Sequence, residues 1–401
     1  MMIRTIHPFP ARMAPNLAIS ELSKLTKGSI VLDPMAGSGT VLRQAAELGH
    51  TAIGFDMDPL AVLMSRVWTT PVDAREVNAL FESLILRTKK LRLSDTTLPW
   101  IDDDKESREF LNYWFGRCQR NDLRKLAFSL NELTQQRQRR GTRVATDLLR
   151  LALSRIIITK DQGASLARDV SHSRPHRVFD QVDFDVFDAL RRSVGTILQR
   201  LASQPPPGGV SMERGDARQL ESLNNACVDL VLTSPPYLNA IDYMRGHRLS
   251  LVWLGHRLSD LRKIRSDSIG TERGPDSSFT STLFEDIEFA MLRSTTPANR
   301  HAAMVARYAE DLYRMMSEIR RVLRPGGVAV LVVGNSCLKG TFIRNSAGVI
   351  RAAKMVGLTL AKRSQRKLPT NKRYLPLPSA AKDALGGRMR TENILTFVAD
   401  R

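Results

Sequence analysis

The chain has 401 residues, 42% hydrophobic and 25% charged, which is enough for a large core and two domains. Its formal net charge of +19 favours a polyanionic partner, with nucleic acid ahead of an anionic membrane, although a basic host proteome is an alternative explanation. No run approaches the ~18 consecutive apolar residues of a membrane span, and the first residues lack an apolar signal region. The three widely spaced cysteines indicate reduced thiols of a cytoplasmic protein and disfavour a zinc site.

The first predicted elements form a strand, a glycine-containing loop and a helix. An apolar strand at 29–33 leads into Pro-Met-Ala-Gly-Ser-Gly-Thr at 34–40, and a helix is predicted over 41–48. A second strand at 52–56 and a helix from 59 to about 68 follow. This alternation predicts an α/β fold with a doubly wound, mostly parallel sheet.

The alternation breaks in the next segment of the chain. Residues 76–204 are charged, are mostly helical in pattern and contain no clear buried strand. The run Pro-Pro-Pro-Gly-Gly at 205–209 then indicates a linker. We therefore expect one discontinuous catalytic domain, 1–75 and 205–401, interrupted by a helical insertion at 76–204.

The sheet pattern resumes after the linker. Strands are predicted at 210–216 and 228–232. A helix end and turn at 321–327 lead into an apolar strand at 328–333, and a last strand is expected at 393–398. These strands complete the predicted sheet.

The strand at 228–232 ends in Thr-Ser-Pro-Pro-Tyr at 233–237. The prolines fix φ and leave carbonyls without a competing local N–H, so a hydroxyl, carbonyl oxygens and one ring are directed beyond the strand. This set suits a flat ring with an exocyclic amino group. The oxygens accept hydrogen bonds from the amino N–H groups while Tyr237 stacks on the ring face. A Pro-Pro turn without a ligand remains the alternative for this segment alone.

Strand ends and glycines in the first half indicate a second ligand. Gly37 and Gly39 allow φ > 0 and close approach of the backbone, although a tight turn without ligand is an alternative. Asp33, Asp56 and Asp216 each close a predicted strand, at the sheet edge where such folds bind ligands, and Asp216 could accept from an adenine amino group. A third glycine and a P-loop lysine are missing, so an adenosyl group with a positive sulfonium fits better than a dinucleotide or triphosphate.

Two motifs together carry a family resemblance. Asp-Pro-Met-Ala-Gly-Ser-Gly-Thr at 33–40 and the run at 233–237 resemble the S-adenosylmethionine-dependent DNA amino-methyltransferases. In that family a Ser-Pro-Pro-Tyr loop is associated mainly with N4 of cytosine, whereas adenine N6 members more often carry Asp or Asn in place of Ser234. The opening His-Pro-Phe-Pro-Ala-Arg at 7–12 is similar to the family's N-terminal cofactor motif.

The resemblance covers most of 1–70 and 205–401 and covers the insertion poorly. The segments 239–245 and 389–395 are similar to one bacterial branch of the family. Met35 is a departure, because many members carry Phe there.

The resemblance implies a class I methyltransferase (Rossmann-like) fold and S-adenosyl-L-methionine as cofactor, with no metal. The residues expected to bind the cofactor are Phe9, Asp33, Gly37, Gly39, Thr40, Asp56 and Asp216. The expected catalytic residues are Ser234, Pro235, Pro236 and Tyr237.

The function implied is site-specific methylation of an exocyclic amino group of a flipped base in double-stranded DNA, with cytosine N4 favoured. Adenine N6, a base amino group of RNA and a non-catalytic DNA-binding protein are the alternatives. A carbon-5 cytosine methyltransferase is disfavoured, because the loop at 233–237 lacks the cysteine nucleophile. We expect a monomer or weak dimer in the cytoplasm of a bacterial or archaeal cell. The recognition sequence and any cognate restriction endonuclease stay open.

Basic residues suggest where DNA lies. Residues 238–401 hold 28 basic and 14 acidic side chains, and the candidates for phosphate contacts there are Arg363, Arg366, Lys367, Lys372 and Arg373. In the insertion, a family site for target recognition, the polar and basic segment 167–177 is the most DNA-like, with a solvated loop as its alternative. Metal ligation by His172 and His176 is disfavoured for want of further ligands, and Tyr113, Trp114 and Phe115 are expected to pack the insertion.

Overall fold

The chain forms two compact units, each built from several segments. The computed structural model describes residues 4–9, 12–169, 175–238, 242–271, 282–293, 299–338, 341–368 and 391–399. The helical unit comprises Met1–Pro10, Asp58–Gly208 and Asp242–Lys263, and the sheet unit comprises Ala11–Met57, Gly209–Ile241 and Ile264–Arg401. The predicted linker at 205–209 contains the boundary between Gly208 and Gly209.

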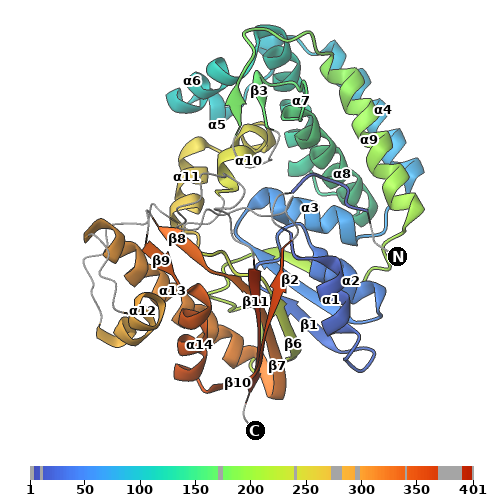
Figure 1. Ribbon diagram of the computed structural model, residues 1–401. Coiled ribbons are helices and arrows are strands. Elements are labelled where there is room, and N and C mark those ends of the chain that lie inside the picture. Colours follow the sequence, from blue (N-terminus) through green and yellow to red (C-terminus); the bar gives the residue numbers. More distant parts are fainter. Residues whose placement is uncertain are drawn as a thin grey trace. The chain divides into compact units, whose positions relative to one another are not determined.

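A seven-stranded sheet forms the centre of the sheet unit (Figure 1), in the order β10-β11-β7-β6-β1-β2-β5. Its strands are β1 Ile30–Asp33, β2 Thr51–Asp56, β5 Val210–Arg214, β6 Val228–Thr233, β7 Leu323–Gly334, β10 Leu358–Lys367 and β11 Thr391–Ala399. Strands β5, β2, β1, β6 and β7 run parallel to one another, and β11 is antiparallel to both of its neighbours, β7 and β10. The predicted α/β fold with a mostly parallel sheet is confirmed.

Helices cover both faces of this sheet, because successive side chains of a strand point to opposite faces. On one face, Leu32 belongs to a core cluster with residues of α13 (Asn299–Val322) and α14 (Asn345–Met355). On the other, a side chain at Gly54 would meet Leu42 of α2 (Thr40–Glu47) at 2.3 Å. Glycine at 54 therefore allows α2 to pack closely on the sheet.

Shorter elements complete the sheet unit. They are α1 Pro15–Leu22, η3 Thr282–Phe284, α12 Glu285–Leu292, β8 Ser336–Leu338 and β9 Thr341–Ile343. Strands β8 and β9 form a separate antiparallel pair. Helix α11, Leu258–Asp267, begins in the helical unit and ends in the sheet unit.

The turn predicted at 321–327 lies inside a strand. Val228 pairs with Leu323 and Leu230 pairs with Val328, so the residues between these two partners bulge out of the β6–β7 ladder. Gly326 adopts φ +75°, a conformation that glycine reaches without a steric penalty. Strand β7 therefore begins earlier than predicted, and the Pro-Gly-Gly signal marks a bulge.

The helical unit contains eight α-helices within the described residues. They are α3 Pro59–Thr69, α4 Ala74–Lys90, α5 Pro99–Asp102, α6 Lys105–Trp114, α7 Arg117–Gln135, α8 Arg140–Ile157, α9 Val186–Ser203 and α10 Met244–Leu251. Short elements are η1 Leu93–Asp95, η2 Val252–Leu254 and the two-residue strands β3 Ala167–Arg168 and β4 His176–Arg177. Among the helices for which the structure gives coordinates, none is long and apolar enough to cross a membrane.

Helix α8 is the centre of the helical unit and packs against α3, α4, α7, α9 and α10. Its Leu148, Leu149 and Leu151 are fully buried, and burying each contributes about 1.5–3 kcal/mol. Because α3 and α10 pack on α8, the compact helical unit extends beyond the predicted insertion at 76–204 on both sides in sequence.

The three aromatic residues at 113–115 behave differently from one another. Phe115 is buried and meets Trp253 edge to face at 5.3 Å. Tyr113 is 53% exposed, with the Arg177 guanidinium 5.0 Å from its ring centre. Trp114 is partly buried, and Tyr113 meets its ring edge to face at 5.1 Å. The prediction that these residues pack within the helical unit therefore holds best for Phe115, whereas Tyr113 packs only with part of its surface.

Candidate active site

The glycine loop connects β1 to α2 at the carboxyl edge of the sheet. Gly37 has φ +51° and Gly39, the N-cap of α2, has φ +85°, so both positions use the left-handed region that favours glycine. The Gly37 amide donates to Oδ2 of Asp56 at 2.8 Å. Asp56 ends β2, and Thr40 is buried as the first residue of α2. The loop is thereby tied to the end of the neighbouring strand.

Asp33 is a buried carboxyl at the end of β1, with 3% of its surface exposed. Its Oδ1 accepts from Thr233 Oγ1 at 2.7 Å and from the Met35 amide at 3.2 Å. Burial raises the pKa of Asp33 to about 7; the two hydrogen bonds oppose the shift, and the charge of Asp56 adds to it. This carboxyl can become ionised near neutral pH when a cation approaches.

The same hydrogen bond links the two sequence motifs. Thr233 ends β6 and precedes Ser234, whereas Asp33 ends β1. Strands β1 and β6 are parallel neighbours, so their carboxyl ends meet at one edge of the sheet. The predicted cofactor loop and the predicted catalytic loop therefore lie side by side, although they are 200 residues apart in sequence.

Asp216 lies in the turn after β5. The prediction that it closes the strand was wrong, because β5 ends at Arg214. Its carboxylate accepts from Arg218, with Nη2 2.6 Å from Oδ2 and Nε 3.0 Å from Oδ1. Asp216 is therefore held in place at the edge of the sheet by a charged partner that the sequence analysis did not identify.

Arg218 also connects this turn to α13. Its Nη1 lies 2.5 Å from Oδ1 of Asp311. Burial raises the pKa of Asp311 to about 6, while Arg218 opposes that shift. Burial would lower the pKa of Arg218, but Asp216 and Asp311 outweigh it and raise that pKa. Arg218 consequently stays charged between its two carboxylates.

The loop after β6 presents two oxygen acceptors. Ser234 Oγ donates to the Val332 carbonyl of β7 at 3.1 Å, which leaves the hydroxyl's lone pairs for a ligand. The Pro236 carbonyl accepts from the Tyr308 hydroxyl at 3.0 Å. Among the residues with described positions, none donates to the carbonyl of Pro235. Ser234 Oγ and the Pro235 oxygen are thus the acceptors of this loop.

Tyr237 is partly buried against the sheet-unit core and Leu368. Its hydroxyl donates to Glu392 Oε1 at 3.3 Å. The backbone there is tightly packed, because a Cβ on Gly270, which has φ +74°, would lie 2.7 Å from the Tyr237 carbonyl oxygen. The end of the loop is held by contacts on its ring, its hydroxyl and its main chain.

Phe9 is the one predicted site residue in the helical unit. Its ring stacks on Tyr243 at 5.1 Å and is tilted against His247 at 5.6 Å. Nδ1 of His247 lies 2.5 Å from Asp58 Oδ2. Burial would raise the pKa of Asp58, but His247 outweighs it and holds that pKa below its usual range. Phe9 therefore belongs to an aromatic cluster of that unit.

The proposed phosphate contacts are only partly described. Arg363 and Lys367 are exposed on β10, whereas Arg366 forms an ion pair with Glu392. Lys372, Arg373 and His172 lie outside the described residues, as do 239–241 and 389–390. His176 is exposed on β4, and no group of three or more metal-ligating side chains occurs among the described residues.

The sequence analysis missed the residues that hold the site together. Thr233, Arg218, Gly270 and Tyr308 each contact a predicted site residue or its supporting turn. Tyr308 lies on an amphipathic helix more than 70 residues after Pro236, so nothing in its local sequence identifies its partner. Only Thr233, adjacent to the Ser-Pro-Pro-Tyr run, carried a local signal.

Two Type II methyltransferases are similar in sequence to this chain. No family model matches the chain. It is 22% identical to the Type II methyltransferase M.MvaI of Kocuria varians, over 96% of this chain and 88% of that protein. It is 23% identical to the Type II methyltransferase M.BsoBI of Geobacillus stearothermophilus, over 66% of this chain and 54% of that protein. The predicted resemblance, with S-adenosylmethionine as methyl donor, is confirmed.

Solved structures are more distant. A SAM-dependent methyltransferase from Methanosarcina mazei aligns over 97% of this chain and 99% of its own, with a TM-score of 0.33 and 8% identity. A likeness at this level adds nothing to the fold assignment, which rests on the order and direction of the strands.

Proposed function

We propose that this S-adenosylmethionine-dependent methyltransferase methylates double-stranded DNA on the exocyclic N4 of a flipped cytosine. The net charge of +19 supports a polyanionic substrate. The Ser-Pro-Pro-Tyr loop and the similarity to Type II methyltransferases support a base amino group as the acceptor. In this proposal the helical insertion reads the recognition sequence, and a cognate restriction endonuclease is the expected partner.

The observation that carries the proposal is the pair of acceptors beside the sheet edge. The amine of cytosine is a poor nucleophile, because its lone pair is delocalised into the ring. Ser234 already donates its hydroxyl hydrogen to Val332, so its oxygen accepts one N–H of the amine, and the Pro235 carbonyl accepts the other. Both bonds return electron density to nitrogen and orient its lone pair toward the methyl donor.

Tyr237 supplies the surface against which the flipped base stacks. Its contacts with Glu392 and Leu368 hold the ring before substrate arrives, so less conformational freedom is lost on binding. The residue therefore acts by positioning the base and takes no part in bond making.

The cofactor residues fit a cationic adenosyl ligand. Asp33 is buried with a pKa of about 7, and Asp56 lies beside the glycine loop, so negative charge is available for the donor's cationic groups. When bound, S-adenosylmethionine supplies an activated methyl group: the N–C bond forms as the C–S bond breaks, and the amine gives up one proton to solvent. The left-handed glycines let the backbone approach the ligand closely.

The test is to incubate the purified protein with labelled S-adenosylmethionine and either duplex DNA or RNA of the host, and to identify the modified nucleoside by mass spectrometry. N4-methylcytosine in DNA is the expected product. N6-methyladenine would refute the choice of base, label in RNA would refute the choice of nucleic acid, and no label would refute the enzyme assignment.

Ser234→Ala should reduce methyl transfer by about tenfold, the value of one hydrogen bond of ~1.4 kcal/mol, with unchanged cofactor affinity. Ser317→Ala is the matched control, because that partly buried serine bonds to the Tyr313 carbonyl on α13. Equal effects of the two substitutions would reject the role of Ser234.

A further inference from the structure

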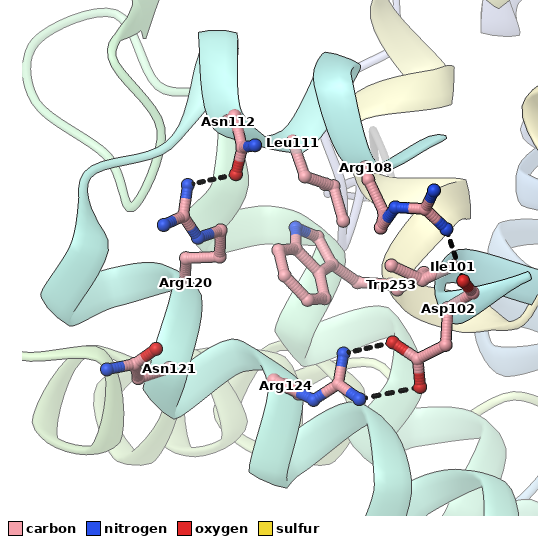
Figure 2. A pocket seen from close by; sticks show the side chains of 9 residues that line it. All are labelled: Ile101, Asp102, Arg108, Leu111, Asn112, Arg120, Asn121, Arg124 and Trp253. Atoms are coloured by element: carbon pink, nitrogen blue, oxygen red, sulfur yellow. Dashed lines mark hydrogen bonds and ion pairs between the residues drawn. The ribbon is translucent and has the colours of Figure 1, made fainter. Parts of the chain in front are cut away.

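The helical unit contains a pocket of about 180 Å³ that the proposed reaction does not use (Figure 2). It lies among α5, α6, α7 and η2. Arginine and asparagine side chains surround its centre, and Trp253 lies between them (Figure 2). Apolar groups from Ile101 and Leu111 complete the lining.

One arginine of the pocket is fully engaged. Arg124 makes a two-pronged ion pair with Asp102, with Nη1 2.7 Å from Oδ1 and Nη2 2.6 Å from Oδ2. It also donates to the carbonyl and hydroxyl of Thr96. Arg124 and Asp102 thus neutralise one another and support the wall of the pocket.

The other two arginines of the pocket bind neutral acceptors. Arg108 donates to the main-chain carbonyl of Asp102, and Arg120 donates to Oδ1 of Asn112, as Figure 2 shows. Both of these acceptors are neutral, and no ion pair of either arginine occurs among the described residues. Each guanidinium has five N–H groups and uses only part of them in these bonds. Asp102 is the one carboxylate among the described residues of the lining and faces three arginines, so the pocket has a net positive charge.

The floor of the pocket contains a buried indole N–H without an acceptor. Trp253 is 2% exposed, and its indole Nε1 has no hydrogen-bond acceptor among the described residues. The neighbouring Trp100 contrasts with it, because its Nε1 donates to the Val252 carbonyl at 2.8 Å. Figure 2 shows the Trp253 nitrogen on the ring edge turned toward Leu111 and Asn112. Because that nitrogen is closed off from solvent, a ligand in the pocket would meet the arginines and not the indole N–H.

We propose that this pocket binds a phosphate group. The charged groups left over in it are the donors of Arg108 and Arg120, whereas the Asp102 carboxylate and the Asn112 oxygen are already engaged. A phosphate offers several acceptor oxygens with negative charge and matches the planar donor sets of Arg108 and Arg120. The phosphate group could belong to the DNA backbone, an identification that rests on the proposed function, or it could be free phosphate.

The first experiment measures binding of a labelled random-sequence duplex as a function of salt, using the full-length protein and the double variant Arg108→Gln/Arg120→Gln. One lost phosphate contact should flatten the log–log salt dependence by about 0.9 and weaken binding several-fold. The matched control is Arg75→Gln/Arg137→Gln, which removes two exposed arginines of the same unit outside the pocket. Equal losses in both double variants would overturn the DNA arm, because they would reflect net charge alone.

The second experiment measures the thermal unfolding midpoint in inorganic phosphate against chloride at equal ionic strength. If phosphate raises the unfolding midpoint of the wild type but not of the Arg108/Arg120 variant, and DNA binding shows no pocket-specific effect, the pocket binds free phosphate. If the protein responds to phosphate but binds no DNA, the inference that the pocket binds phosphate stands, and DNA is refuted as the substrate. Absence of a pocket-specific effect in both experiments overturns the inference.

Discussion

The hydroxyl of Tyr308 donates to the main-chain carbonyl of Pro236 over 3.0 Å, from a helix that is distant in sequence from the catalytic loop. Tyr308 is 1% exposed, so water does not compete for this bond. Three residues further along α13, on the same helix face, Asp311 binds Arg218, which holds Asp216. One face of α13 therefore supports both the catalytic loop and the turn after β5.

Removing that hydroxyl should weaken catalysis without affecting cofactor binding. Tyr308→Phe keeps the buried ring but leaves the Pro236 carbonyl without its donor, at a cost of about 1–3 kcal/mol in the free energy of unfolding. We expect kcat to fall several-fold while the dissociation constant of S-adenosylmethionine stays unchanged. Steady-state kinetics, chemical denaturation and calorimetry measure the three quantities.

Tyr313→Phe is the control for this substitution. Tyr313 lies on the same helix, and its ring packs against Phe284 at 5.3 Å. If both variants lost kcat equally, the bond to Pro236 would not be the cause.

Cofactor affinity should increase with pH through about 7. The folded protein keeps the proton on Asp33 up to its raised pKa of about 7, whereas an unfolded chain ionises it near 3.8. Asp33 therefore contributes stability to the free protein that is fully present below about pH 4 and is lost as pH rises to 7. A cationic ligand favours the carboxylate, so binding below pH 7 should release a proton, with affinity changing by up to about tenfold per pH unit.

Calorimetry in two buffers of different ionisation enthalpy measures this proton release. Asp33→Asn should flatten the pH dependence of affinity between pH 5 and 8. A wild-type affinity that is constant across pH 7 would contradict the assignment.

Asp56 should have two separable roles, since it accepts from the Gly37 amide and carries charge. Asp56→Asn keeps an oxygen acceptor and should lower cofactor affinity with little change in unfolding free energy. Asp56→Ala removes the acceptor as well and should also destabilise the protein by about 1 kcal/mol. Calorimetry and denaturation distinguish these outcomes, and unaltered affinity in both variants would remove Asp56 from the cofactor site.

The ring of Tyr237 should matter more than its hydroxyl. Tyr237→Ala should cost about 1–3 kcal/mol of base stacking and lose most methyl transfer, with cofactor affinity retained. Tyr237→Phe keeps the ring, removes the hydroxyl with its bond to Glu392, and should stay within a few-fold of wild type. Methyl transfer to duplex DNA measures both, and the idea fails if the alanine variant turns over normally.

Local patterns in the sequence predicted the fold class and much of the sheet. The first strands and helices, β1, α2, β2 and α3, lie within about two residues of their predicted ends, because buried apolar runs and glycines act over a few neighbouring residues. The bulge in β7 and the early end of β5 were not predicted, because they depend on pairing with distant strands.

For the site, too, some features depend on local sequence and others on contacts between distant residues. Sequence alone determined which groups are present: the paired glycines, the strand-end carboxyls and the Ser-Pro-Pro-Tyr loop, whose spacing and residue types are local properties. The tertiary structure decided their surroundings: Thr233 beside Asp33, Tyr308 beneath Pro236, and a pocket with a net positive charge around Trp253. Burial, partner identity and pKa depend on residues up to 200 positions away, so only the folded chain specifies them.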